Sequence, residues 1–257
     1  MLKIKLIIKN ILLKIPIINY LFIFLNYKIV KTNTSIHGYK IPNLIMTKNN
    51  YQIYDKNNAG KITGLDNNMN YEYAFSKKII DFANKNKIFF DIGAAYGHYS
   101  SLASNLYKEV YCFEGDPLEL FYLKKNMRRF KNVKIIDKYL TNNFNLNHII
   151  KKLSLYPDII KIDVEGEEIQ ILQNCDIALK NGASFLIEFH TRKILKKFKN
   201  NISIINKFYS KFEEFGYTLE FNEHHDYDRL HSEGISDKYW SNKKLTTNNF
   251  AIFAKPN

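Results

Sequence analysis

Cysteine is scarce in this chain of 257 residues, which contains only Cys112 and Cys175. Both lie in apolar stretches, VYCFEG and IQILQNC, and their separation is not that of a metal-binding or redox pair. This scarcity argues against a disulfide framework and against a cysteine-based zinc site. We expect two buried, reduced thiols.

Arginine is also rare, although the chain is strongly basic. Only 4 of the 38 basic residues are arginines, and the formal net charge is +13. Such a charge ordinarily indicates an anionic partner, but nucleic-acid readers depend on the bidentate contacts of arginine. The lysines accompany many Asn and Ile residues, a composition typical of an AT-rich genome. A nucleic-acid partner is therefore disfavoured.

No apolar run is long enough to span a bilayer comfortably, since a membrane helix needs about 20 apolar residues. The N-terminal segment has lysines at positions 3, 5, 9 and 14, followed by thirteen uncharged residues at 15–27. No small-residue cleavage site of a secretory signal follows them. Two interpretations remain: a helix packed on the domain or on a partner, which we favour, or a basic amphipathic segment on a membrane surface through residues 1–28.

Apolar residues themselves are plentiful, at 46% hydrophobic and 15% aromatic, which excludes global disorder. From position 88 onward, strand and helix patterns alternate. Strands are expected at 88–93, 110–115, 133–137, 158–163, 184–190, 216–222 and 248–255, and helices at 71–86, 98–108, 117–130, 145–154, 167–182 and 207–216. Such alternation predicts an α/β fold, a parallel sheet with helices on both faces.

We divide the chain into three parts. A basic and apolar helical segment is expected at 1–31, and a small β-hairpin extension at 32–70, with strands in IHGYKIPNLIM and YQIYDKN. The main domain is expected at 71–257.

The loop DIGAAYG at 91–97 follows the most apolar of the expected strands. In parallel sheets of this kind, ligands bind beyond the carboxyl ends of the strands. Small residues let a ligand lie against the main chain, and Glu114, which ends the next strand about 20 residues on, is placed to take a ribose diol. Asp91 ahead of the first glycine would repel a pyrophosphate but attract an ammonium group. S-adenosylmethionine therefore suits this loop better than a dinucleotide.

Three stretches resemble the FkbM family of class I S-adenosylmethionine-dependent methyltransferases: FFDIGAAYGHYSSLA, VYCFEGDPLELFYLKKNM and IIKIDVEGEEIQIL. FLIEFH and NYEYAF support the resemblance, which covers roughly residues 71–190. The chain departs from the family in having Ala95 where Asn is usual, and in a short segment after the third strand.

The resemblance implies a Rossmann-like, doubly wound sheet of seven strands with a C-terminal antiparallel strand. It also implies methyl transfer to oxygen, commonly on sugars of glycans, glycolipids or secondary metabolites. The cofactor contacts that we expect are Asp91, Gly93, Ala94, Ala95, Tyr96, Gly97, Tyr99, Glu114, Asp116 and Asp137.

Methyl transfer to an alcohol requires a base, and acidic residues follow the two later strands. The candidates are Asp163, Glu165, Glu188 and His190. Glu167 and Glu168 are better explained as acids that complement a helix N-terminus. Asp163 with Glu188 is an alternative cation-binding pair, although we expect no metal.

The segment NEHHDYDRLHSEG at 222–234 should leave the sheet on the cofactor side. Its metal-capable residues suit substrate contact better than a metal, and two aromatic residues nearby suit stacking on a sugar ring. The candidate substrate residues are His224, His225, Tyr239 and Trp240.

The leading hypothesis is a cytoplasmic O-methyltransferase for a small-molecule or glycan substrate, associated with the inner face of the membrane if residues 1–28 bind lipid. The alternatives are an RNA methyltransferase, suggested by the charge, and a catalytically silent scaffold attached to a membrane.

Overall fold

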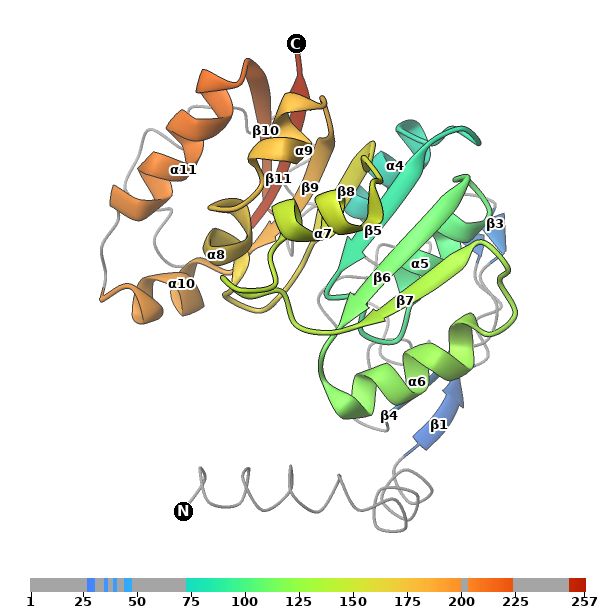
Figure 1. The fold of residues 1–257 in the computed structure, drawn as a ribbon. Coiled ribbons are helices and arrows are strands. Elements are labelled where there is room, and N and C mark those ends of the chain that lie inside the picture. Colours follow the sequence, from blue (N-terminus) through green and yellow to red (C-terminus); the bar gives the residue numbers. More distant parts are fainter. Residues whose placement is uncertain are drawn as a thin grey trace, which may run out of the picture.

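The computed structural model describes residues 27–30, 35–36, 39–40, 44–47, 73–199, 203–223 and 250–257. A seven-stranded sheet has the order β10-β11-β9-β8-β5-β6-β7 (Figure 1). Its strands are β5 (Ile88–Ile92), β6 (Glu109–Glu114), β7 (Val133–Asp137), β8 (Ile159–Ile162), β9 (Ser184–Phe189), β10 (Tyr217–Glu223) and β11 (Phe250–Pro256). In this sheet β11 runs antiparallel to both β10 and β9, and the other four pairs are parallel. This confirms the predicted sheet with its C-terminal antiparallel strand.

Helices cover both faces of this sheet, as predicted. One face carries α4 (Tyr73–Asp81), α5 (His98–Ser104) and α6 (Pro117–Met127). The other carries α7 (Leu146–Leu153), α8 (Glu168–Leu172), α9 (Asp176–Lys180), α10 (Thr191–Lys197) and α11 (Ser203–Glu214). Adjacent residues of β5 point to opposite faces of the sheet. Phe89 packs against the helices α4 to α6, and Phe90 packs in the core under the helices α7 to α11. Each is fully buried, which stabilises the fold by roughly 1.5–3 kcal/mol per side chain.

The order of the strands creates a switch point beside β5. The chain runs from β5 to β6 and β7 on one side and then returns to β8 on the other. At the carboxyl ends of the neighbouring strands β5 and β8, the backbone N–H of Asp163 donates to the carbonyl of Ile92 at 3.0 Å. The carboxyl ends of β5, β6 and β8 therefore meet at one edge, where ligands of such sheets bind.

The single helix expected at 167–182 is instead two short helices, α8 and α9. The break is fixed by Asn147 of α7, whose side-chain oxygen accepts the Ile177 N–H at 2.9 Å and whose own N–H donates to the Asn174 carbonyl. A contact from another helix thus overrides the continuous apolar pattern. Helix α10 was not predicted, and α11 begins four residues earlier than expected.

The N-terminal part differs from the prediction where it is described. Strand β1 (Tyr27–Val30) lies within the segment expected to be helical and pairs antiparallel with β4 (Leu44–Thr47). Strands β2 (Ser35–Ile36) and β3 (Tyr39–Lys40) form a second pair. Figure 1 shows β4 beside α6. Residues 1–26 and the strand expected at 51–57 lie outside the described residues. Within the described residues, no helix has the length and apolar character to cross a membrane.

Candidate functional site

A cavity of about 400 Å³ opens at the switch point. Its walls come from the loop after β5, the β6–α6 connection, the segment after β7 and the end of β8. Nine of the expected site residues line it: Gly93, Ala94, Ala95, Tyr96, Tyr99, Glu114, Asp116, Asp163 and Glu165. The structure therefore brings the three motif stretches to one place.

Two glycines of the loop have backbone conformations that other residues rarely adopt, with φ of 76° at Gly93 and 84° at Gly97. A Cβ at Gly93 would lie 1.8 Å from the carbonyl oxygen of Asp163, and one at Gly97 would lie 2.6 Å from the methyl carbon of Met127. Their lack of side chains thus permits close packing within the protein. Gly97 faces α6 rather than the cavity wall.

Asp91 lies behind the cavity wall and is fully buried. Its carboxylate accepts a hydrogen bond from the Ser100 hydroxyl at 2.5 Å and lies 3.4 Å from the ammonium group of Lys161. Burial raises the pKa of Asp91, while Lys161 and Ser100 act in the opposite direction. The charge that we expected to attract a cationic ligand is therefore paired inside the protein.

Lys161 connects this buried acid to the cavity. It is 2% exposed, and its Nζ donates to the Gly93 carbonyl at 3.1 Å and to Asp163 at 3.3 Å. The sequence prediction missed this residue. Its one signal was a lysine in the middle of a strand expected to be buried on both faces.

Glu114 is held rigidly at the end of β6. Its carboxylate accepts backbone N–H bonds from Ala95 at 2.9 Å and from Gly115 and Asp116, both at 2.8 Å. Burial raises its pKa, and these three bonds oppose that shift. The carboxylate therefore joins the first two loops of the site in a fixed orientation.

Two further acids follow on the same side. Asp116 caps α6 by accepting from the N–H groups of Leu118 at 2.9 Å and Glu119 at 3.1 Å. Glu119, which the sequence prediction missed, lines the cavity and is half-buried. Burial, together with the charges of Glu114, Asp116 and Asp163, raises the pKa of Glu119 to about 8. It lies within the motif stretch at 110–127, in which only Glu114 and Asp116 were expected to contact the cofactor.

The wall as a whole is acidic. Six carboxylates line it against two lysines: Glu114, Asp116, Glu119, Asp163, Glu165 and Glu167 against Lys138 and Lys161. Apolar surface comes from Phe113, Leu140 and Ile171, and Tyr139 covers Gly115. A cation attached to an apolar or aromatic body is the ligand that such a lining suits.

Asp137 lies apart from this wall. Its side chain is 57% exposed and pairs with Lys124 at 2.8 Å. The remaining candidates fall beyond the described residues: His224, His225, Tyr239 and Trp240.

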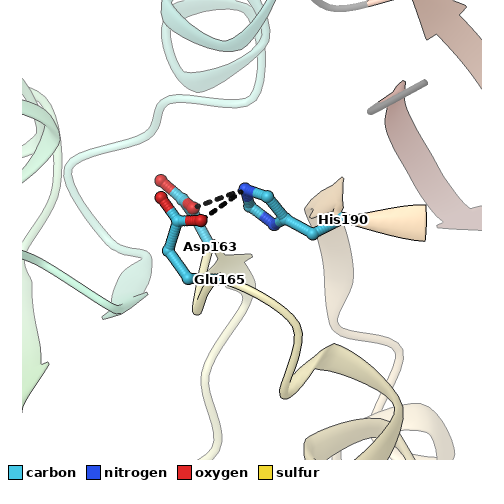
Figure 2. A group of neighbouring side chains, drawn as sticks. All are labelled: Asp163, Glu165 and His190. Carbon is cyan, nitrogen blue, oxygen red and sulfur yellow. Dashed lines mark ion pairs between the residues drawn. The ribbon is translucent and has the colours of Figure 1, made fainter. Parts of the chain in front are cut away.

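The candidate bases gather behind the end of β8 (Figure 2). Nδ1 of His190 lies 2.7 Å from Glu168, and its Nε2 lies 3.3 Å from Glu165, 3.4 Å from Glu188 and 4.0 Å from Asp163. Burial lowers the pKa of His190, but the hydrogen bond and charge of Glu168, together with the charges of Glu188 and Asp163, outweigh it, so the net shift is upward. Glu168, interpreted from the sequence as a helix N-terminal acid, is also the partner of this imidazole.

No protein-family model matches the chain, and no curated protein matches it in sequence. Several of the solved structures that it resembles are methyltransferases. An rRNA methylase from Streptococcus thermophilus has 10% identity and a TM-score of 0.49, covering 72% of this chain and 95% of that one. A precorrin-6y C5,15-methyltransferase from Geobacter metallireducens has 16% identity and a TM-score of 0.45, covering 75% of this chain and 90% of that one. TYW2 of M. jannaschii, solved with AdoMet, has 16% identity and a TM-score of 0.43, covering 71% of this chain and 73% of that one. At these values the likenesses carry no argument about function.

Proposed function

We propose that this chain is an S-adenosylmethionine-dependent O-methyltransferase that acts on a hydroxyl of a sugar-containing substrate, as its resemblance to the FkbM family implies. The observation that carries the proposal is the acidic cavity at the switch point of a chain whose net charge is +13. An excess of carboxylates favours a ligand with ammonium and sulfonium groups and disfavours a pyrophosphate.

The lining fits the separate parts of this cofactor. Glu114 is fixed where a carboxylate can accept from ribose hydroxyls. Tyr139, with its ring over Gly115, and the apolar side chains of Phe113 and Leu140 suit a nucleobase. When bound, S-adenosylmethionine supplies an electrophilic methyl group and loses its positive charge on transfer.

Asp163 is the group best placed to take the proton of an acceptor hydroxyl. Of the four candidate bases, only Asp163 and Glu165 line the cavity, and the Glu165 side chain is 66% exposed and paired with Lys193. His190 and Glu188 lie behind Asp163, with 3% and 6% of their surfaces exposed. These two are better placed to orient Asp163 and Glu165 than to touch the acceptor.

An RNA substrate is the second candidate, because the charge of +13 favours a polyanion. One experiment separates the two. The purified protein is incubated with tritiated S-adenosylmethionine and extracts of its own cells, divided into glycan and nucleic-acid fractions. We expect label that resists ribonuclease and is released with the sugars.

Calorimetry tests the cofactor assignment directly. S-adenosylmethionine should bind with one site per chain, and NAD should not bind. Binding of NAD with no response to S-adenosylmethionine would overturn the assignment. In the labelling experiment, label found only in ribonuclease-sensitive material would keep the cofactor assignment but identify RNA as the acceptor.

A further inference from the structure

The side chains of Asp163, Glu165 and His190 form a cluster at the rear of the cavity, which we call the β8–β9 cluster (Figure 2). They come from the end of β8, the turn that follows it and the end of β9. One ligand atom of each lies within 4.8 Å of the other two. We propose that the β8–β9 cluster binds a divalent metal ion, with Glu188 as a further oxygen neighbour.

The orientation of His190 is the first support. Its side chain is 4% exposed, and Nδ1 lies 2.7 Å from Oε1 of Glu168, which is itself fully buried and also accepts the Gly166 N–H at 3.0 Å. A carboxylate at Nδ1 keeps a proton on that nitrogen and directs the lone pair of Nε2 to the opposite side. Nε2 then faces Asp163 and Glu165, as the imidazole of a metal site does.

The charge around the ring is the second support. Carboxylate oxygens of Asp163, Glu165, Glu168 and Glu188 lie within 4.0 Å of the two ring nitrogens. Lys161 lies 3.3 Å from Asp163 and Lys193 pairs with Glu165, and one imidazolium would add only a single further positive charge. After these two lysines are counted, two negative charges remain on the four carboxylates, and a divalent cation between Nε2 and the facing carboxylates balances them better than a proton does.

The backbone supports the arrangement as well. Glu165 has φ of 57° and Gly166 of 109°, and this turn brings the Glu165 side chain back toward the end of β9. The donor set contains two carboxylates and one imidazole and no thiolate. Ions that accept both oxygen and imidazole ligands, Mn²⁺ and Zn²⁺, suit it better than Mg²⁺ or Ca²⁺, which prefer oxygen throughout.

Asp163 and Glu165 line the cavity as well, so the ion would lie at its wall. Its place in the reaction rests on the proposed function: an acceptor hydroxyl bound there would be polarised and would lose its proton more readily. Binding of the ion itself does not depend on that function.

The test is a titration of the full-length, chelator-treated protein with MnCl2, followed by electron paramagnetic resonance of the free ion, with neither cofactor nor acceptor present. We expect one bound Mn²⁺ per chain, displaced by ZnCl2 but not by MgCl2. Glu165→Gln and His190→Gln should each weaken binding by about tenfold or more. Because no methyl transfer is measured, failure here leaves the methyltransferase proposal standing.

Glu167→Gln is the matched control. Glu167 lines the same cavity, is 46% exposed and pairs with Lys197, but it does not belong to the cluster. Its variant should bind Mn²⁺ within about twofold of the parent. If His190→Gln fails to fold, Glu165→Gln decides, since that side chain is 66% exposed. Absence of binding to the parent, or equal losses in Glu165→Gln and Glu167→Gln, would overturn the proposal.

Discussion

Lys161 joins the buried Asp91 to the cavity and to Asp163. Its Nζ lies 3.4 Å from Asp91 and 3.3 Å from Asp163, and both Lys161 and Asp91 are almost completely buried. Removing one partner of a buried pair leaves an uncompensated charge. We expect Lys161→Met to lower the free energy of unfolding by about 3–5 kcal/mol, measured by urea denaturation.

The control for this prediction is an ion pair at the surface. Lys134 pairs with Glu109 at 2.9 Å, and its side chain is 51% exposed. Lys134→Met should cost no more than about 1 kcal/mol. Adding Asp91→Asn to Lys161→Met should restore part of the lost stability, because the buried charge is then gone. Equal losses for the two lysine variants would show that Asp91 does not need its partner.

Glu119 should make cofactor binding depend on pH. Its pKa is raised to about 8, so it loses its proton, and gains negative charge, as the pH rises through that value. S-adenosylmethionine carries a sulfonium charge that S-adenosylhomocysteine lacks, while their other ionisable groups are the same. Calorimetry should therefore show the preference for S-adenosylmethionine increasing by roughly threefold or more between about pH 7 and about pH 9.

Glu119→Gln removes the titrating group and keeps the shape of the side chain. We expect its preference for the charged ligand to stay level over the same pH range. A variant with the slope of the parent would assign the effect to another acid of the wall.

At the scale of single residues, the sequence predicted the position of the cavity better than it predicted the side-chain contacts around it. Glu114 and Asp163 could be placed because they end expected strands. Lys161 and His190 owe their environments to partners from other elements, Asp91 of β5 and Glu168 of α8, and no local pattern encodes those pairings. The charge argument from Asp91 overlooked Lys161, and the acidic character that it anticipated comes instead from the acids of the cavity wall.

Among the elements, α6 links stability to the site through its N-cap. Asp116 accepts from two N–H groups of the first turn and also lines the cavity. Asparagine can accept the same bonds without a charge, whereas alanine cannot. We expect Asp116→Ala to lose about 1 kcal/mol of unfolding free energy and Asp116→Asn to lose much less, both measured by urea denaturation.

Cofactor affinity then separates the two roles of Asp116. If its charge attracts the cofactor, both variants should bind S-adenosylmethionine more weakly, and by similar factors. If Asp116→Asn binds S-adenosylmethionine as the parent does, the role of Asp116 is that of a helix cap alone.

The elements themselves were predictable to the extent that one face or both are buried. The strands of the sheet read as apolar runs because helices cover both sides, and β5 shows this in the pair Phe89 and Phe90. The break between α8 and α9 depends on Asn147, which is distant in sequence. Among the α10 side chains whose burial the structure describes, Ile194 is fully buried and Lys193, Lys196 and Lys197 are exposed, so these residues offered little periodicity to detect.

For the molecule as a whole, charge is divided between a basic chain and an acidic cavity. Four of the lysines lie at positions 3, 5, 9 and 14, outside the described residues and ahead of the cavity-lining residues at 92–171. Each lysine near an anionic bilayer contributes about 1 kcal/mol of attraction. We therefore propose that this segment governs membrane association without contributing to cofactor binding.

Deleting residues 1–26 tests this division, and the deletion should end there because β1 starts at Tyr27 and pairs with β4. The shortened protein should bind S-adenosylmethionine within about twofold of the parent but no longer float with anionic liposomes. A full-length variant with Lys3, Lys5, Lys9 and Lys14 changed to Gln should lose flotation as well, since it keeps the apolar residues and lacks the charges. A shortened protein that folds but no longer binds the cofactor would place the segment in the domain and remove the case for a surface anchor.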